Sequence, residues 1–142
     1  MKNLYFSHFL KQFLLFWTGA VGYYSLEVIF RGFSHFSMAI CGGICFLFIY
    51  FIFEKFPHMS RVKKCFLGAS FITLAELITG CIVNLALGLN VWSYYHMPMN
   101  LWGQICLPFS VLWFLLCFPV LYLCGIFKDK VFSCPIFQVI EE

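Results

Sequence analysis

The chain has 142 residues, of which 63% are hydrophobic and only 11% are charged, and its formal net charge at pH 7 is +3. Soluble domains are about 45–50% apolar, so the composition predicts one membrane-embedded domain over residues 1–142 and excludes a separate soluble domain. The modest charge does not indicate nucleic acid as a partner. No phosphate-binding loop of the G-x-x-x-x-G-K-[ST] kind occurs, so any ATP hydrolysis would have to come from another subunit.

The first predicted transmembrane helix covers about residues 11–30. This run is too long for a signal peptide, whose apolar region has roughly 7–15 residues. Gly19 and Gly22 in it allow another helix to approach closely. Near its end, Glu27 and Arg31 stand four residues apart, in the favourable order for an ion pair on one helical face. The pair either fixes this helix against its neighbours or contacts a ligand at the mouth of the bundle.

The second predicted helix covers about residues 36–53, and its Gly42-Gly43 pair provides another close-approach surface or a kink point. A tight turn precedes it, in which the polar side chain of His35 can satisfy an exposed helix end. The loop that follows, up to residue 64, is the most basic stretch of the chain, and Pro57 in it prevents helix continuity.

The third predicted helix covers about residues 66–89, long enough for the roughly 20 residues that a bilayer crossing needs. It carries Glu76 near its middle, and a carboxylate at that depth costs about 2.5–3.5 kcal/mol if it faces lipid. Small and polar residues share its helical face: Ala69, Thr73, Glu76, Gly80 and Asn84. We expect Glu76 inside the bundle, facing the first or second helix, either in hydrogen bonds between helices or in an ion or substrate path.

The connector at residues 90–100 has no formal charge, and Asn100 is its last residue. It contains three amphipathic aromatic residues: Trp92, Tyr94 and Tyr95. Such rings prefer the headgroup level, so we interpret them as interfacial anchors, with a lid over a substrate as the alternative. The fourth predicted helix covers about residues 101–127, with Gln104 near its start and Pro108 and Pro119 available to bend it.

The eight cysteines fall mostly inside the apolar runs, where oxidising enzymes have poor access. No C-x-x-C pair occurs, and no second pair completes a tetrahedral metal site. We therefore interpret them as small apolar side chains and expect no metal or other cofactor. A site made by His35, His96 and Glu27 is conceivable, but histidines in loops need no ligand.

Positive charge is distributed very unevenly along the chain. Eight of the nine Lys and Arg residues lie in the amino end, in the second connector, which joins the second and third predicted helices, or in the carboxyl end. The ninth, Arg31, lies in the first connector, which joins the first and second predicted helices. Cytoplasmic segments of membrane proteins carry such an excess. The sequence therefore predicts an all-α, four-helix integral membrane protein with both termini in the cytoplasm.

Three ordered blocks, covering about residues 19–125, resemble a known family. The blocks are Glu27-x-x-x-Arg31-Gly32-x-x-His35-x-Ser37-Met38-x-x-x-Gly42-Gly43, then Thr73-x-x-Glu76-x-x-x-Gly80-x-x-x-Asn84, then Trp92-Ser-Tyr94 with Pro98-x-Asn100-x-x-Gly103-Gln104-Ile105-Cys106, Ser110 and Trp113. The pattern is similar to that of the small membrane proteins called Putative ABC-transporter type IV, the CmpB-like proteins. Ser93 departs from it, because that family commonly has an acid there. The resemblance implies a transport-related membrane protein.

Two functional hypotheses follow. In the first, the chain is a permease-like subunit of the cell membrane, helped by a second copy, a membrane-complex partner or a separate ATPase. Its polar path would use seven side chains: Glu27, Arg31, His35, Glu76, Asn84, Asn100 and Gln104. In the second, it is a structural or regulatory subunit whose polar residues hold the helices together. We expect no enzyme activity, because no Ser/His, paired-Asp or H-E-x-x-H arrangement is present.

Overall fold

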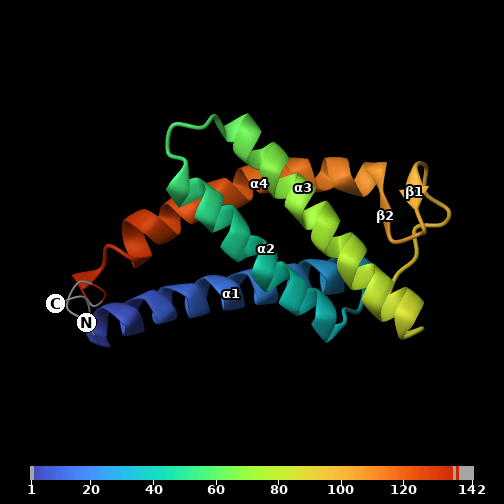
Figure 1. The fold of residues 1–142 in the computed structure, drawn as a ribbon, viewed down its shortest axis with the longest axis horizontal. Helices are drawn as coiled ribbons and strands as arrows, with labels where there is room; N and C mark the ends of the chain where they lie inside the picture. Colours follow the sequence, from blue (N-terminus) through green and yellow to red (C-terminus); the bar gives the residue numbers. More distant parts are fainter. Residues whose placement is uncertain (1, 136, 138–142) are drawn as a thin grey trace.

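The computed structural model describes residues 2–135 and 137 and is built from four long helices (Figure 1). Their bounds are α1 Lys2–Arg31, α2 Phe36–Lys55, α3 Arg61–Gly80 and α4 Leu107–Ile126. A π-helical turn extends each of the last two, η1 Cys81–Ala86 after α3 and η2 Phe127–Val131 after α4. All four are long and apolar enough to cross a membrane. This confirms the predicted all-α, four-helix membrane protein.

The fourth helix begins at Leu107 and not at about residue 101 as predicted. The preceding residues form a small antiparallel hairpin, β1 Asn100–Leu101 with β2 Ile105–Cys106. Trp102 and Gly103 in its turn have φ angles of 51° and 67°, a left-handed conformation that a right-handed helix cannot contain. The sequence reads as one apolar run through this turn, which is why the prediction extended the helix too far.

The other helices also differ from their predicted bounds, chiefly at their polar ends. Helix α1 begins at Lys2, ahead of the predicted residue 11. Helix α3 begins at Arg61 because the Ser60 side chain caps it by accepting a hydrogen bond from the Lys63 amide, and its extension η1 ends at Ala86. Prediction from apolar runs alone misses such charged first turns.

Helices α2 and α3 cross the middle of the molecule, with α1 against α2 and α4 against α3 (Figure 1). The α1/α2 crossing is tight, because a Cβ atom built on Gly19 would lie 2.6 Å from the Gly42 carbonyl oxygen. Gly43 likewise lies directly under the Phe16 ring. Helix α1 has no comparable packing against α3 or α4 in the described part of the chain. The predicted close-approach role is confirmed for Gly19 and the Gly42-Gly43 pair.

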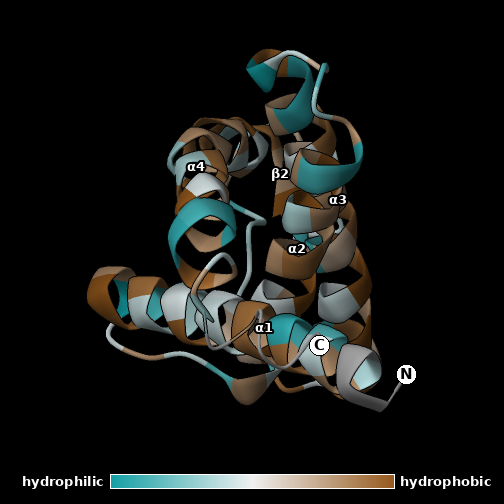
Figure 2. Ribbon diagram, turned by 90° about the vertical axis from the view of Figure 1, so that its left-hand side faces the viewer, coloured by the Kyte–Doolittle hydropathy of each residue, from teal (hydrophilic) through white to brown (hydrophobic). Residues whose placement is uncertain are grey.

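Basic side chains from three segments meet at one end of the bundle. The Lys11 ammonium lies 5.8 Å from the centre of the Phe132 ring, and those of Lys64 and Lys128 lie 5.2 and 6.0 Å from the Phe53 ring. The helices are mostly hydrophobic along their lengths, and hydrophilic residues gather near the α2–α3 connector (Figure 2). The α1–α2 connector and the hairpin lie at the opposite end (Figure 1).

Two groups of buried side chains form the core, a larger one among α1, α2, α3 and α4 and a smaller one near the hairpin end. Six of the eight cysteines are buried, and three of them belong to the larger group. They pack as the small apolar side chains that the composition predicted.

Candidate functional site

The predicted polar face of α3 and η1 points into the protein. Thr73 donates a hydrogen bond to the Ser110 hydroxyl of α4 at 3.1 Å, and Glu76 and Asn84 are 2% and 7% exposed. A Cβ atom on Gly80 would lie 2.6 Å from the Gln104 side-chain oxygen. The face therefore packs against α4 and the hairpin, which it can approach closely because Gly80 has no side chain.

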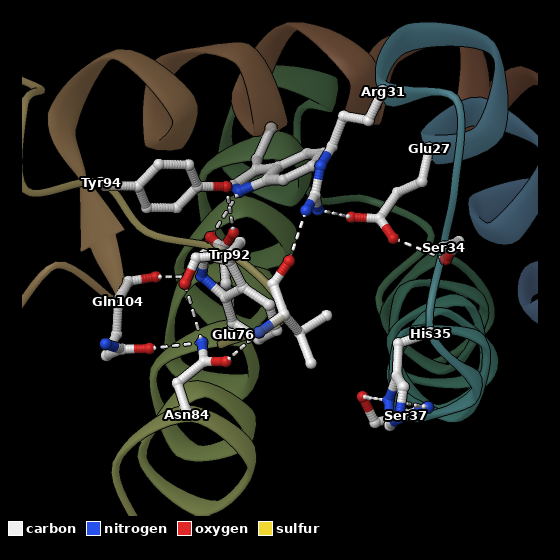
Figure 3. A network of polar contacts seen from close by, with 12 residues as sticks. Glu27, Arg31, Ser34, His35, Ser37, Glu76, Asn84, Trp92, Tyr94 and Gln104 are labelled. Carbon is white, nitrogen blue, oxygen red and sulfur yellow. Dashed lines mark hydrogen bonds and ion pairs between the residues drawn. The ribbon is translucent and has the colours of Figure 1, made fainter. Parts of the chain in front are cut away.

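Glu76 accepts one hydrogen bond on each carboxylate oxygen (Figure 3). The Tyr94 hydroxyl donates to Oε1 at 2.8 Å, and the Trp113 indole nitrogen donates to Oε2 at 3.0 Å. Tyr94 lies in the connector at residues 90–100 and Trp113 lies in α4. The expectation that Glu76 faces the first or second helix is therefore wrong as far as its hydrogen-bond partners are concerned. Two neutral donors hold a carboxylate in one orientation without a cation.

Asn84 organises the path of the connector beside it (Figure 3). Its Nδ2 donates to the Trp92 carbonyl at 3.1 Å and to Gln104 Oε1 at 2.8 Å, and its Oδ1 accepts from the Val91 amide at 2.6 Å. The Trp92 indole in turn donates to the Gln104 carbonyl at 3.0 Å. Asn84 lies in η1, and such wide turns often occur at functional positions.

Glu27 and Arg31 form the ion pair predicted from their spacing, with 2.9 Å between Arg31 Nη1 and Glu27 Oε1. The Ser34 hydroxyl donates to the second Glu27 oxygen at 2.6 Å. Arg31 Nη2 also donates to the Val91 carbonyl at 2.5 Å. Because Asn84 binds the amide of the same Val91, the end of α1 and the polar face of η1 belong to one connected network.

His35 and Asn100 do not join this network. The His35 side chain caps α2, accepting from the Ser37 amide at 3.3 Å. Asn100 stabilises the hairpin turn, donating to the Met97 carbonyl at 2.9 Å and accepting from the Gly103 amide at 3.1 Å. Five of the seven predicted path residues are thus brought together, and these two have local roles.

Two of the three aromatic rings of the connector at residues 90–100, those of Trp92 and Tyr94, lie inside the protein, contrary to their interpretation as headgroup anchors. Trp92 is 7% exposed and Tyr94 is half-buried, whereas Tyr95 is 61% exposed. Burial and the neighbouring Glu76 carboxylate raise the pKa of Tyr94 above its usual value, so its hydroxyl remains a donor. The hydrogen-bonding roles of Trp92, Tyr94 and Trp113 were not predicted, although all three stand in the motif blocks. The rings of Trp92 and Tyr94 also fit the headgroup level, and Trp113 lies inside the apolar run of the fourth predicted helix.

A cavity of about 450 Å³ lies beside this network, between α1, α2 and α4. Glu76 forms part of its wall and is the one charged residue among the described residues that line it. Gly22 also lines it, and nothing lies within 4 Å of a Cβ atom built there, so Gly22 is not the close-approach residue that the sequence predicted. Leu26 and Ile29, both exposed on α1, line it too, which leaves it open toward the surrounding lipid.

The site separates into a closed part and an open part. Among residues 5–135 and 137, whose side chains the structure describes, every buried side-chain nitrogen or oxygen has a hydrogen-bond partner. The same residues include no group of three His, Cys, Asp or Glu side chains placed to hold a metal ion. The network can therefore fix the connector, and the cavity is where a small molecule would have space.

Residues 9–139 match a family model described as Putative ABC-transporter type IV, which covers most of the chain. The match includes every residue of the network and of the cavity wall. No curated protein and no solved structure matches the chain.

Proposed function

The chain belongs to the family described as Putative ABC-transporter type IV, and on this premise we propose that it is a permease-like subunit of a transport complex in the cell membrane. The cavity with Glu76 in its wall carries the proposal. A buried carboxylate within a membrane helix is costly, and here it borders space that a ligand could fill. In this proposal the chain itself catalyses no reaction.

Four helices enclose little space, so a second copy or a larger membrane partner would complete the pathway. Energy would come from a separate ATPase subunit. The basic surface around the α2–α3 connector is our candidate for its docking surface, with the exposed Lys55 at the end of α2 and the exposed Arg61 and Lys63 at the start of α3. Charged rims of this kind steer the association of partners more than they add affinity.

Co-purification tests this proposal. The tagged full-length chain is isolated from native membranes in a mild detergent, bound proteins are identified by mass spectrometry, and ATP hydrolysis by the preparation is measured. We expect an ATPase at a defined ratio, lost when Lys55, Arg61 and Lys63 are all changed to Gln. Reproducible recovery without any ATPase would contradict the proposal.

A structural or regulatory subunit is the alternative, and the complete hydrogen bonding of the buried network favours it. Glu76→Gln separates the two functions, because it keeps the shape of the side chain and one of its two acceptor oxygens but removes its charge. A permease subunit should assemble normally with this change and lose ligand-stimulated ATP hydrolysis. A structural subunit should keep both.

We propose further that both termini face the cytoplasm, since eight of the nine Lys and Arg residues lie on that side of such a topology. Single cysteines at Ser60 and Ser93, both exposed, test it on a cysteine-free background. An impermeant thiol reagent applied to intact cells should label position 93 and leave position 60 unlabelled. Labelling of position 60 and not of position 93 would show that both termini face the outside of the cell.

A further inference from the structure

The cavity has the size and the access of a site for a lipid-soluble molecule. Its volume of about 450 Å³ falls within the range of roughly 300–1,000 Å³ typical of small-molecule sites. Glu76 stands ten residues before Ala86, the end of the third span, which is about 15 Å along a helix. The opening past Leu26 and Ile29 lies nearer the end of the first span at Arg31, but it continues past the exposed Gly22, nine residues or about 14 Å before Arg31, at the depth of the hydrocarbon core. A molecule that enters there has to dissolve in lipid first.

The charge of the cavity wall selects the sign of a ligand. Glu76 is the one acidic residue among its described lining residues, and no Lys, Arg or His lines it. Arg31 lies outside the wall and is engaged by Glu27 and by the Val91 carbonyl. A carboxylate has about four acceptor positions, and Tyr94 and Trp113 use one on each oxygen. Capacity remains for a donor from the cavity, whereas an anion would meet like charge.

Two aromatic rings stand beside this carboxylate. Tyr23 of α1 and Trp113 of α4 both line the cavity, and their ring centres are 5.7 Å apart. Faces of Trp and Tyr rings attract organic cations, most strongly where water is excluded. The remaining wall is mostly apolar, and Thr18 and Ser25 are the hydroxyl-bearing residues among its described lining. It suits a bulky apolar group attached to the cation.

Building on the proposed function, we propose that this cavity binds a lipophilic organic cation, with its charged part near Glu76, Tyr23 and Trp113. Its apolar part occupies the groove that Gly22 leaves open between α1 and α4. The proposal depends on two features of the cavity, the charge of Glu76 and the open groove beside Gly22. Each of them can be removed by its own substitution.

Binding is measured on the purified full-length chain in nanodiscs of zwitterionic phosphatidylcholine, with empty nanodiscs as the background. The probes are tetraphenylphosphonium and tetraphenylborate, which have nearly the same size and shape but opposite charge. We expect saturable binding of the cation with about one site per chain, and no binding of the anion above background. Equal binding of both ions, or preference for the anion, would overturn the proposal.

Three variants identify the site. Glu76→Gln should weaken binding of the cation about tenfold or more, since it removes the charge partner. Gly22→Leu should weaken it similarly by filling the groove. Gly125→Leu is the matched control, because Gly125 is a helical glycine outside the cavity whose nearest neighbour to a Cβ atom is Phe53 at 4.0 Å, and it should bind like the unchanged chain. Unchanged binding in Gly22→Leu would place the probe elsewhere and reject the site.

If Glu76→Gln fails to fold, Gly22→Leu still tests whether the cation binds in this cavity. The Gly22→Leu variant should fold, because the new leucine side chain enters open space. The assay contains neither an ATPase nor a transport step. A failure to bind the cation would thus refute the ligand class and leave the co-purification result standing, and a missing ATPase would not affect the binding result.

Discussion

Two neighbouring positions on one face of α1 have sharply different surroundings, although both are glycines. A Cβ atom at Gly19 would collide with Phe46 Cβ, so α1 and α2 meet there almost backbone to backbone. Three residues later on the same face, Gly22 has nothing within 4 Å of its Cβ position and borders the cavity. A small residue can thus seal an interface or keep a space open, depending on whether a partner helix is present.

Glu76 lies where the closed and open regions meet. Tyr94 and Trp113 hold its carboxylate on the closed side, and the cavity borders it on the other. The closed region gives the acid a fixed orientation, since both of its oxygens are engaged. The open region leaves the oriented carboxyl group of Glu76 accessible to a molecule in the cavity.

The largest expected effect comes from adding a side chain at Gly19, where α1 and α2 meet. Gly19→Leu would force α1 away from Phe46 and Gly42, and overpacking of this severity costs about 3 kcal/mol or more of folding free energy. Gly22→Leu should change stability by less than about 0.5 kcal/mol, as at ordinary exposed positions. Unfolding in mixed micelles with increasing dodecyl sulfate measures both. Equal losses would contradict the difference between the surroundings of Gly19 and Gly22.

A smaller effect on stability is expected from substitutions of Glu76. Glu76→Leu strands the Tyr94 hydroxyl and the Trp113 indole, and buried donors without partners should lower the folding free energy by about 2 kcal/mol. Glu76→Gln retains an acceptor and should cost less than half as much. The same unfolding assay ranks them. If Leu leaves stability unchanged, the hydrogen-bonded side of Glu76 contributes nothing to the fold.

The ion pair at the end of α1 should couple by about 1 kcal/mol in a double-mutant cycle of Glu27→Gln and Arg31→Gln. Arg31→Gln should be the more costly single change, because Arg31 also donates to the Val91 carbonyl. The double variant should recover part of the summed loss. Strictly additive losses would show that the two side chains act independently.

The smallest effect is a pH dependence due to Tyr94, whose pKa is raised in the folded protein by burial and by Glu76. A raised pKa contributes stability that is complete below the unfolded value of about 10 and is lost as pH rises further, since only the unfolded state releases the proton. Between about pH 9 and pH 10.5 this loss amounts to about 0.8 kcal/mol. Tyr94→Phe should show a correspondingly flatter decline. Parallel declines would mean that Tyr94 titrates alike in both states.

Several features follow directly from the sequence. The four helices follow from apolar runs of membrane length, and the Glu27/Arg31 pair follows from its four-residue spacing, because both depend on residues close in the chain. The inward position of Glu76 also follows from local pattern, since small and polar residues share its face and lipid cannot solvate it.

Only the tertiary structure decided which groups those residues meet. Tyr94 and Trp113 lie 18 and 37 residues from Glu76, and no helical or strand period relates them to it. The hairpin at residues 100–106 depends on left-handed backbone angles, which cannot be predicted from an apolar run of sequence. The opposite environments of Gly19 and Gly22 depend on where α2 and α4 lie. Contacts between distant segments determine a site, whereas local sequence determines which segments become helices.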